Sequence, residues 1–169
     1  MNEVFRAIVD EIDHKSTCLQ MRFEDSSWRS DISSEPGWYL IKTNTPVKVL
    51  QSVGVPKHEA HTNIPRTIAM AEVLLRSGAV IMQTGSKDYV VYNGEALDLK
   101  ARAREHESGH AKTYCLALSE YELLRNYRWA FCYVAVSECR TISKDDKLLR
   151  QAIEQAWRAI HGWPILCRK

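Results

Sequence analysis

Apolar and polar positions alternate along this chain with the periods of both helices and strands. Apolar residues at a spacing of three or four predict amphipathic helices, and Pro65 suits the first turn of a further helix that reaches about Leu75 or Arg76. The expected helices are residues 3–13, Glu95–His106, residues 116–126 and Lys144–Ile160. The expected strands are the apolar runs Trp38–Ile41, Ala79–Gln83, Tyr89–Tyr92 and Trp129–Val136.

The order of these elements predicts a mixed α/β fold with a small, mostly antiparallel sheet. Turn residues at 85–88 separate the strand at 79–83 from the strand at 89–92, which predicts a hairpin. The segment 44–64 contains prolines and a glycine and predicts a long connection. A length of 169 residues suits one domain, or one domain with an arm.

Composition and charge narrow the class of protein. No apolar run approaches the roughly 20 residues that a membrane helix needs, and the first residues lack the pattern of a signal peptide, so we expect a cytoplasmic protein. The five cysteines form no Cys-x-x-Cys pair, and we expect free thiols. Residues 1–36 carry 4 basic and 8 acidic side chains, whereas residues 37–169 carry 19 and 13, a weak indication of nucleic-acid binding.

The candidate chemistry lies after the strand that ends at Tyr92. Tyr92-Asn93-Gly94 predicts a strand followed by a turn, and the helix that follows carries Leu99, Arg102 and His106. Residues three and four apart share one helix face, so Arg102 and His106 point the same way. Arg104 points roughly to the opposite side and is expected to face solvent. The strand, the turn and the helix are therefore expected to bring a phenol, a guanidinium and an imidazole close together.

These residues and their order resemble the signatures of the GIY-YIG nuclease family. Gly37-Trp38-Tyr39 is similar to the first signature, and Tyr92-Asn93-Gly94 to the second. Leu99, Arg102 and His106 stand at the offsets of the family's leucine, arginine and histidine. Glu154, on a late helix, resembles the glutamate that binds the metal, and the closing residues 162–166 resemble the family's proline-containing C-terminal segment.

The resemblance implies a three-stranded central sheet, with an N-terminal helical arm and acidic loop at residues 1–36 and the nuclease domain at 37–169. The insertion between the two tyrosine strands would span about 44–78. It also implies a Mg²⁺-dependent endonuclease of the restriction or phage type that hydrolyses phosphodiester bonds in DNA, with Mn²⁺ as a second candidate metal. Cleavage of both strands would favour a homodimer.

The resemblance also implies a role for each site residue. Tyr39 or Tyr92 would contact the attacking water, and Arg102 would lower the pKa of a phenol or hold the phosphate. His106 would assist proton transfer or hold a tyrosine in place. Glu154 would bind one Mg²⁺ that keeps most of its waters.

Several alternatives stay open on the sequence alone. Trp38 and Asn93 alter the middle of both signatures, and Cys167 stands where the family has an asparagine, so a catalytically inactive module that binds nucleic acid or protein is one alternative. RNA is a second candidate substrate. The arginines four residues on either side of Glu154 also fit a surface row of ion pairs. His58-Glu59-Ala60-His61 lacks helical metal-site spacing and indicates a loop surface or a DNA contact.

Overall fold

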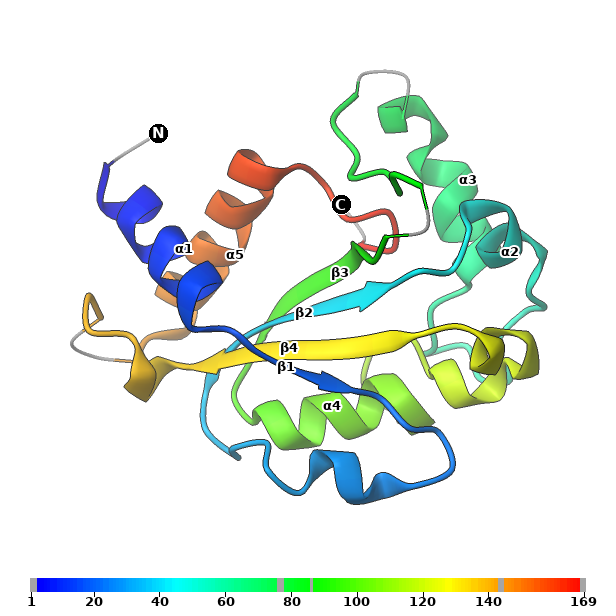
Figure 1. Ribbon diagram of the computed structural model, residues 1–169, viewed down its shortest axis with the longest axis horizontal. Helices are drawn as coiled ribbons and strands as arrows, with labels where there is room; N and C mark the ends of the chain where they lie inside the picture. Colours follow the sequence, from blue (N-terminus) through cyan, green and yellow to red (C-terminus); the bar gives the residue numbers. More distant parts are fainter. Residues whose placement is uncertain (1–2, 76–77, 86, 143–144, 168–169) are drawn as a thin grey trace.

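The fold is a four-stranded antiparallel sheet with helices on both faces (Figure 1). The computed structural model describes residues 3–75, 78–85, 87–142 and 145–167. The strands are β1 (Thr17–Gln20), β2 (Gly37–Thr43), β3 (Tyr89–Ala96) and β4 (Trp129–Ala135), in the spatial order β1-β4-β2-β3. The helices are α1 (Glu3–Lys15), α2 (Val47–Ser52), α3 (Ile64–Leu75), α4 (Leu99–Ser108) and α5 (Lys147–His161). The 3₁₀ helices are η1 (Ser26–Arg29), η2 (Leu118–Glu120), η3 (Glu122–Asn126) and η4 (Val136–Glu138).

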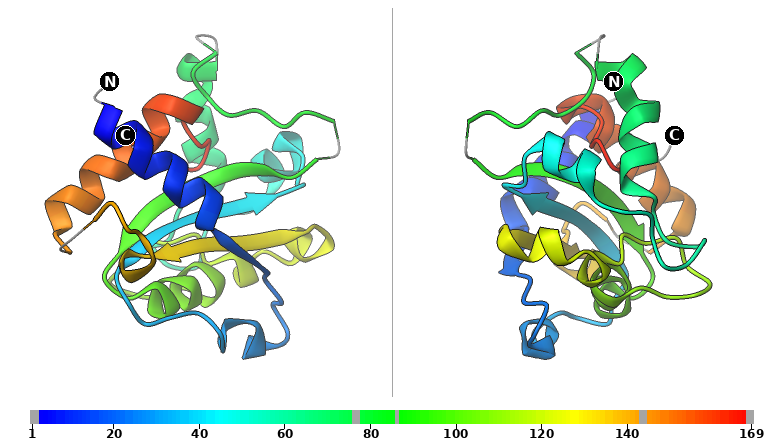
Figure 2. Two further views of the ribbon diagram at one scale, coloured as in Figure 1. Left: turned by 60° about the vertical axis from the view of Figure 1, so that its left-hand side comes forward. Right: turned by 90° about the vertical axis from the view of Figure 1, so that its right-hand side faces the viewer.

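The two faces of the sheet carry separate hydrophobic clusters because successive residues of a strand point to opposite sides. Tyr39 and Ile41 of β2 belong to the cluster that includes Leu99 of α4. Trp38 and Leu40 belong to the other cluster, which α1 and α5 supply. Figure 2 shows α1 beside α5 on one side of the sheet and α4 on the other. The expected α/β class with a mostly antiparallel sheet is therefore confirmed, with four strands instead of three.

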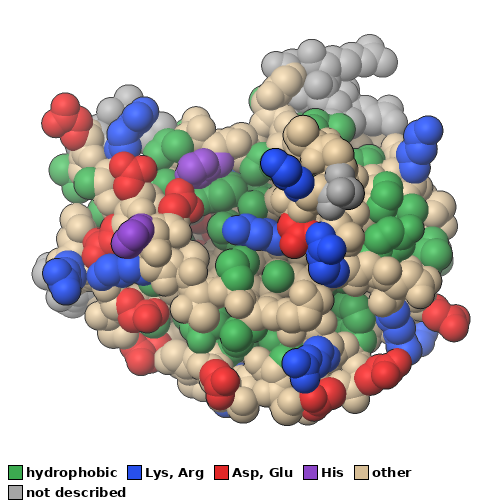
Figure 3. Space-filling model, in the orientation of Figure 1, with side chains coloured by type: hydrophobic (Ala, Val, Ile, Leu, Met, Phe, Trp, Pro, Cys, Tyr) green, Lys and Arg blue, Asp and Glu red, His purple; other side chains and the backbone are tan. Residues whose placement is uncertain are grey.

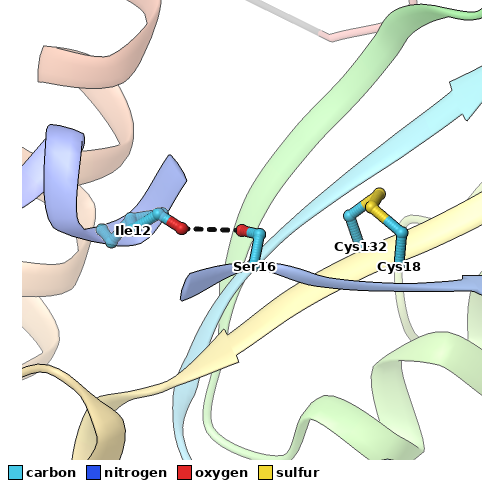
Figure 4. The surroundings of a disulfide bond; sticks show 4 residues. All are labelled: Ile12, Ser16, Cys18 and Cys132. Atoms are coloured by element: carbon cyan, nitrogen blue, oxygen red, sulfur yellow. Dashed lines mark hydrogen bonds between the residues drawn. A yellow bond between two sulfur atoms is a disulfide. The ribbon is translucent and has the colours of Figure 1, made fainter. Parts of the chain in front are cut away.

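The N-terminal segment is joined to the same sheet and to α5. The Trp157 indole on α5 donates to Asp13 on α1 at 2.9 Å, and β1 pairs with β4. In that pairing Cys18 lies directly opposite Cys132, and the two form a disulfide (Figure 4). The expectation of five free thiols was wrong for these two cysteines, because a strand register that no Cys spacing reveals brings them together.

The predicted hairpin between residues 79–83 and 89–92 is wrong. Within 79–83 only Val80 is buried, and it makes one isolated bridge to Trp163. β3 pairs instead with β2 along one edge, and on β3 the Val91 carbonyl accepts from Leu166 N–H at 2.8 Å. The C-terminal segment therefore occupies a place that the sequence assigned to a hairpin partner.

The predicted turn at Gly94 and helix start at Glu95 are also wrong. β3 runs through Gly94 to Ala96, paired with residues 37–40 of β2, and α4 begins only at Leu99. Asp98 caps that helix by accepting from Ala101 N–H at 2.8 Å, as an aspartate at an N-cap does. Residues 116–126 form η2 and η3 instead of the expected α-helix.

The other elements agree with the sequence within a few residues. α1, α3, β2, β4 and α5 lie where the pattern placed them, and Asp146 caps α5. The predicted turn residue Ser86 and helix ends Arg76 and Lys144 lie outside the described residues. Within the described ranges, no helix is long and apolar enough to cross a membrane.

Candidate active site

Tyr39 is the centre of the candidate site and is fixed by two glycines of the sheet. It is 2% exposed on the face of β2 that α4 covers, and it lies opposite Gly94 of β3. A Cβ at Gly94 would lie 2.4 Å from the Tyr39 hydroxyl oxygen, and a Cβ at Gly37 would lie 2.2 Å from the Val134 carbonyl oxygen. Both signature glycines are therefore required by close approach, which is a physical reason for their place beside the tyrosine.

Arg102 reaches the Tyr39 hydroxyl from α4. Its Nε donates to the Tyr39 oxygen at 2.9 Å, and its two terminal nitrogens donate to Glu105 Oε2 at 2.9 Å and to the Tyr114 carbonyl at 2.8 Å. Three acceptors therefore hold one guanidinium in a fixed plane. The sequence predicted that Arg102 faces a tyrosine and that Arg104 faces solvent. Arg102 contacts Tyr39, and Arg104 is exposed.

His106 contacts the same hydroxyl from the next turn of α4. Its Nε2 lies 3.0 Å from the Tyr39 oxygen, and its Nδ1 accepts from the Leu116 backbone N–H at 3.3 Å. Burial lowers the pKa of His106 well below its usual value, and the neighbouring Arg102 acts in the same direction, so the imidazole is neutral. A neutral imidazole that accepts at Nδ1 carries its proton on Nε2. His106 therefore donates to Tyr39.

The Tyr39 oxygen thus receives two hydrogen bonds, one from Arg102 and one from His106. Burial raises the pKa of the Tyr39 phenol well above its usual value, while the charge of Arg102 opposes this shift. The phenol is protonated at neutral pH in the absence of a ligand. Its ionised form would meet two donors that are already oriented, which is the arrangement that stabilises an oxyanion.

Tyr92 completes an aromatic cluster with Tyr39 and His106. Its ring stacks on that of Tyr39 with centroids 6.1 Å apart and meets the ring of His106 edge-on at 4.7 Å. Burial raises the pKa of Tyr92 to about 12, and the side chain of Arg102 acts against that shift by charge and hydrogen bonding. Tyr92 is half-buried whereas Tyr39 is enclosed, so Tyr92 is the phenol nearer to solvent.

Glu154 approaches this cluster from α5, on the opposite face of the sheet. Its side chain is 15% exposed and forms an ion pair with Arg158, one turn further along the helix. Glu154, Tyr39, Asn93 and Gly94 line one small pocket at the β3 edge. The missing side chain at Gly94 leaves room for the Tyr39 phenol. The structure thus brings four of the predicted site residues into contact, namely Tyr39, Tyr92, Arg102 and His106, and places Glu154 on α5, where it shares a pocket lining with Tyr39.

The surroundings of Glu154 agree in part with the surface ion pairs considered above. Arg158 pairs with Glu154, but Arg150 turns away to Glu95 at 2.9 Å. Both arginine side chains are buried, at 8% and 4% exposure, so neither pair lies on a solvated surface. Burial raises the pKa of Glu154, and Arg158 counteracts the shift.

The donor set at Glu154 fits one hard cation bound through a single carboxylate. Among the described residues, no group of three or more His, Cys, Asp or Glu side chains could hold a metal. Mg²⁺ prefers oxygen ligands and keeps several waters, so Glu154 would be its one carboxylate ligand here, beside a small and mostly apolar pocket. The contact with Arg158 occupies one oxygen of Glu154, and a cation bound there would compete with this contact.

Sequence reasoning missed Asn93 and Arg158 as members of the site. Asn93 is 3% exposed, and its Oδ1 accepts from Arg158 Nε at 2.7 Å. The Sγ of Cys167 lies 3.3 Å from the same oxygen. Asn93 is the middle residue of the second signature, a position that was assumed to take no part in the chemistry. Its place in the signature could have identified it as a site residue. An amide therefore lies beside Cys167, the position at which the family's asparagine is missing.

The residues His58 and His61 do not form a metal site with their neighbours in the described structure. His58 is exposed, as expected of a loop surface, but His61 is buried at 7% exposure. Its Nδ1 lies 3.0 Å from Glu120 Oε1. The expected loop surface is therefore wrong for His61, because η2 and α4 pack over it.

Charge on the face drawn in Figure 3 is mixed. Lys and Arg side chains are interspersed there with Asp and Glu. Some opposite charges pair directly, such as Lys15 with Glu11 at 2.8 Å. The basic balance of residues 37–169 therefore forms no single-sign surface on this face, and the site itself supplies the stronger indication of function.

No family model, no curated protein and no solved structure matches this chain. The likeness to the GIY-YIG nucleases therefore rests on the two signatures, on the spacing of Leu99, Arg102 and His106, and on the late glutamate.

Proposed function

We propose that this protein is a Mg²⁺-dependent endonuclease that hydrolyses phosphodiester bonds in DNA. One observation carries the proposal: the Tyr39 oxygen receives hydrogen bonds from Arg102 Nε at 2.9 Å and from His106 Nε2 at 3.0 Å. An enclosed phenol that meets a fixed guanidinium and a neutral imidazole suits proton transfer in a polar reaction.

In the proposed mechanism Tyr39 is the general base for the attacking water. Because the resting phenol is protonated, it must first release its own proton to solvent. Arg102 and His106 then stabilise the ionised oxygen, and the attacking water passes a proton to that oxygen as the water oxygen attacks phosphorus. His106 cannot take this proton at Nε2, since Nδ1 is already an acceptor for Leu116 N–H. Its role is therefore to donate and to hold Tyr39 in place.

Tyr92 and Arg102 contact the phosphate in this proposal. Tyr92 is half-buried and lies against both Tyr39 and His106, so a phosphate at its hydroxyl is close to the base. Arg102 supplies positive charge next to it. Mg²⁺ on Glu154 would neutralise the charge that develops on the phosphate and the leaving oxygen. Glu154 would hold the ion in competition with Arg158, whose guanidinium contacts this carboxylate and is itself held by Asn93.

We further propose a restriction-type or phage-type enzyme of the cytoplasm that acts as a homodimer, with one site for each DNA strand. These finer statements follow the family resemblance. The ion pair between Arg158 and Glu154 favours a second candidate, an inactive module of the same fold that binds nucleic acid, because it occupies the carboxylate that the metal needs.

The test incubates purified protein with plasmid DNA, and separately with RNA, in Mg²⁺ or in EDTA. We expect Mg²⁺-dependent cleavage of DNA by the wild type and a loss of about 100-fold or more in Glu154→Ala and in Tyr39→Phe. Arg104→Ala is the matched control on the exposed side of α4 and should cleave like the wild type.

Cleavage of RNA alone would replace the DNA assignment and leave the hydrolytic mechanism in place. Equal cleavage by the wild type and both variants would show a contaminating nuclease. That outcome, or no cleavage under any condition, overturns the proposal in favour of the inactive module.

A further inference from the structure

A pocket of about 610 Å³ lies between α3, the loop before it and the C-terminal segment. Its lining includes His61, Asn63, Arg66, Met70, Tyr114 and Trp163. It is separate from the small pocket at Glu154, and no role in the mechanism above is assigned to it. Most of its residues come from the expected insertion at about 44–78.

The pocket adjoins the candidate active site at two points. The Tyr114 carbonyl accepts from the guanidinium of Arg102 at 2.8 Å, and Tyr114 lines the pocket. Cys167 lines it as well, and Asn93, the neighbour of Tyr92 in β3, donates its backbone N–H to the Cys167 sulfur at 3.3 Å. A molecule in the pocket would therefore lie next to the residues that contact the phosphate.

His61 adds a buried ring nitrogen, unpartnered within the described part of the chain, to the residues that line the pocket. Its ring is 7% exposed, and its Nε2 has no hydrogen-bond partner among the described residues. A Cβ at Gly109 would lie 2.8 Å from this nitrogen, so the close approach of the glycine backbone leaves room for the ring. A buried nitrogen without a partner costs about 1–3 kcal/mol, so the described residues leave a polar group of the lining unsatisfied.

The residue types in the lining match a nucleotide. Tyr114 and Trp163 contribute aromatic rings, on which a base can stack with about 1–3 kcal/mol of stabilisation. The guanidinium of Arg158 lies over one face of the Trp163 ring, 4.6 Å from its centre, so a base would stack on the other face. Asn63 and Glu59 offer amide and carboxylate groups suited to the edge of a base. Arg66 is exposed at the rim and suits a phosphate. A free phosphate alone would leave the aromatic wall without a role.

We propose that this pocket binds a nucleoside monophosphate unit of the substrate, the nucleotide next to the bond that is cleaved. The inference rests on the proposed nuclease function for the identity of the substrate. Base stacking on the wall formed by Tyr114 and Trp163 positions the chain, while Arg66 contacts its phosphate. Tyr92 and Arg102 then contact the adjacent phosphate.

The test measures nucleotide binding without cleavage. Protein with ¹⁵N-labelled tryptophan is titrated with each deoxynucleoside and ribonucleoside monophosphate, and with inorganic phosphate, while the indole N–H signals are followed by NMR. Trp163→Phe assigns the signal of Trp163. We expect one or more nucleotides to shift this signal at millimolar concentration, and inorganic phosphate to leave it unchanged.

Arg66→Glu should weaken that binding about fivefold or more, since it places a negative charge beside the phosphate. Arg104→Glu makes the same change at an exposed arginine outside the pocket and should leave the affinity unaltered. No shift of the Trp163 signal with any nucleotide overturns the proposal, as does equal binding by Arg66→Glu and the wild type.

Cleavage assays on the same preparations separate this inference from the proposed function. If the protein binds nucleotides, Arg66→Glu weakens that binding, and neither DNA nor RNA is cleaved, the nucleotide-binding proposal is supported and the nuclease proposal is overturned. If the wild type cleaves nucleic acid but no nucleotide shifts the Trp163 signal, the nuclease proposal is supported and the nucleotide-binding proposal is overturned.

Discussion

Gly94 sets the position of the Tyr39 hydroxyl, and its replacement provides the sharpest test at the scale of one residue. In Gly94→Ala the new Cβ would lie 2.4 Å from that oxygen, and Tyr39 cannot retreat because it is packed between Tyr92 and Phe131. We expect a loss of about 1–3 kcal/mol in the free energy of unfolding. Nucleic-acid cleavage should fall by about 100-fold. Urea unfolding and initial cleavage rates measure the two effects.

Gly54→Ala is the matched control for this change. A Cβ at Gly54 meets no atom within 4 Å, so stability and cleavage should stay near the values of the wild type. Full cleavage activity in Gly94→Ala would contradict the placement of Tyr39 at the reacting centre.

His106 predicts a distinct dependence of stability on pH. Burial holds the pKa of His106 in the folded protein well below 6.5, whereas in the unfolded chain it lies near 6.5. The unfolded state therefore binds more protons as the pH falls below about 6.5, and the free energy of unfolding decreases. For one such group the slope is about 1 kcal/mol per pH unit.

Urea unfolding at pH 7.5 and at pH 5.5 tests this prediction in the wild type and in His106→Gln. Glutamine is uncharged at both pH values, so the variant should lose about 1 kcal/mol less than the wild type on acidification. Equal losses in the two proteins would mean that His106 is charged in the folded state.

Individual residues of the site could be predicted only as far as local geometry extends. The spacing of Arg102 and His106 along one helix is set by 3.6 residues per turn, so the sequence was sufficient to place both and to exclude Arg104. The proton on His106 depends on Leu116 N–H, ten residues away in an irregular segment. No local pattern encodes that contact, and the donor role of the imidazole therefore needed the structure.

At the scale of an element, α5 carries both Glu154 and Arg158, the arginine whose guanidinium is paired with the Glu154 carboxylate. Arg158 pairs with Glu154, donates to Asn93 Oδ1 at 2.7 Å and lies 4.6 Å from the centre of the Trp163 ring. Arg158→Gln removes a charge that a divalent ion would otherwise have to displace. We expect the affinity for Mn²⁺, a spectroscopic substitute for Mg²⁺, to rise about tenfold in this variant.

Electron paramagnetic resonance of free and bound Mn²⁺ measures this affinity without reference to cleavage. Glu154→Gln should abolish binding, and Arg104→Gln controls for the loss of one positive charge from the molecule. Weaker binding of Mn²⁺ by Arg158→Gln than by the wild type would contradict competition, and would instead make Arg158 a support of the ion.

Elements were predictable from sequence where their own side chains determine them. α1 and α5 bury one stripe of apolar residues, and the periodicity alone located them. The apolar run at residues 79–83 failed as a strand because β3 has β2 on one edge and the C-terminal segment on the other. Strand pairing is a long-range property, and a short apolar run carries no information about its partner.

The whole molecule depends on a crosslink that joins its N-terminal segment to the sheet. The Cys18–Cys132 disulfide closes a long stretch of chain, because the two cysteines are 114 residues apart in sequence. Such a link stabilises chiefly by restricting the unfolded chain, by about 2–5 kcal/mol. Cys132 faces the cluster shared by α1 and α5, whereas Tyr39 faces α4. Stability and catalysis are therefore separable across the sheet.

Cys18→Ser should accordingly lower the free energy of unfolding of the oxidised protein by about 2–5 kcal/mol and leave its cleavage rate near that of the wild type. Unfolding in urea with and without a thiol reductant measures the effect, and the reduced wild type should match Cys18→Ser. Thiol titration of the denatured, oxidised wild type should find the three free cysteines and not all five. Disulfides are rare in the cytoplasm. Five reactive thiols would therefore contradict the crosslink and agree with the proposed cytoplasmic location, whereas three would count against that location.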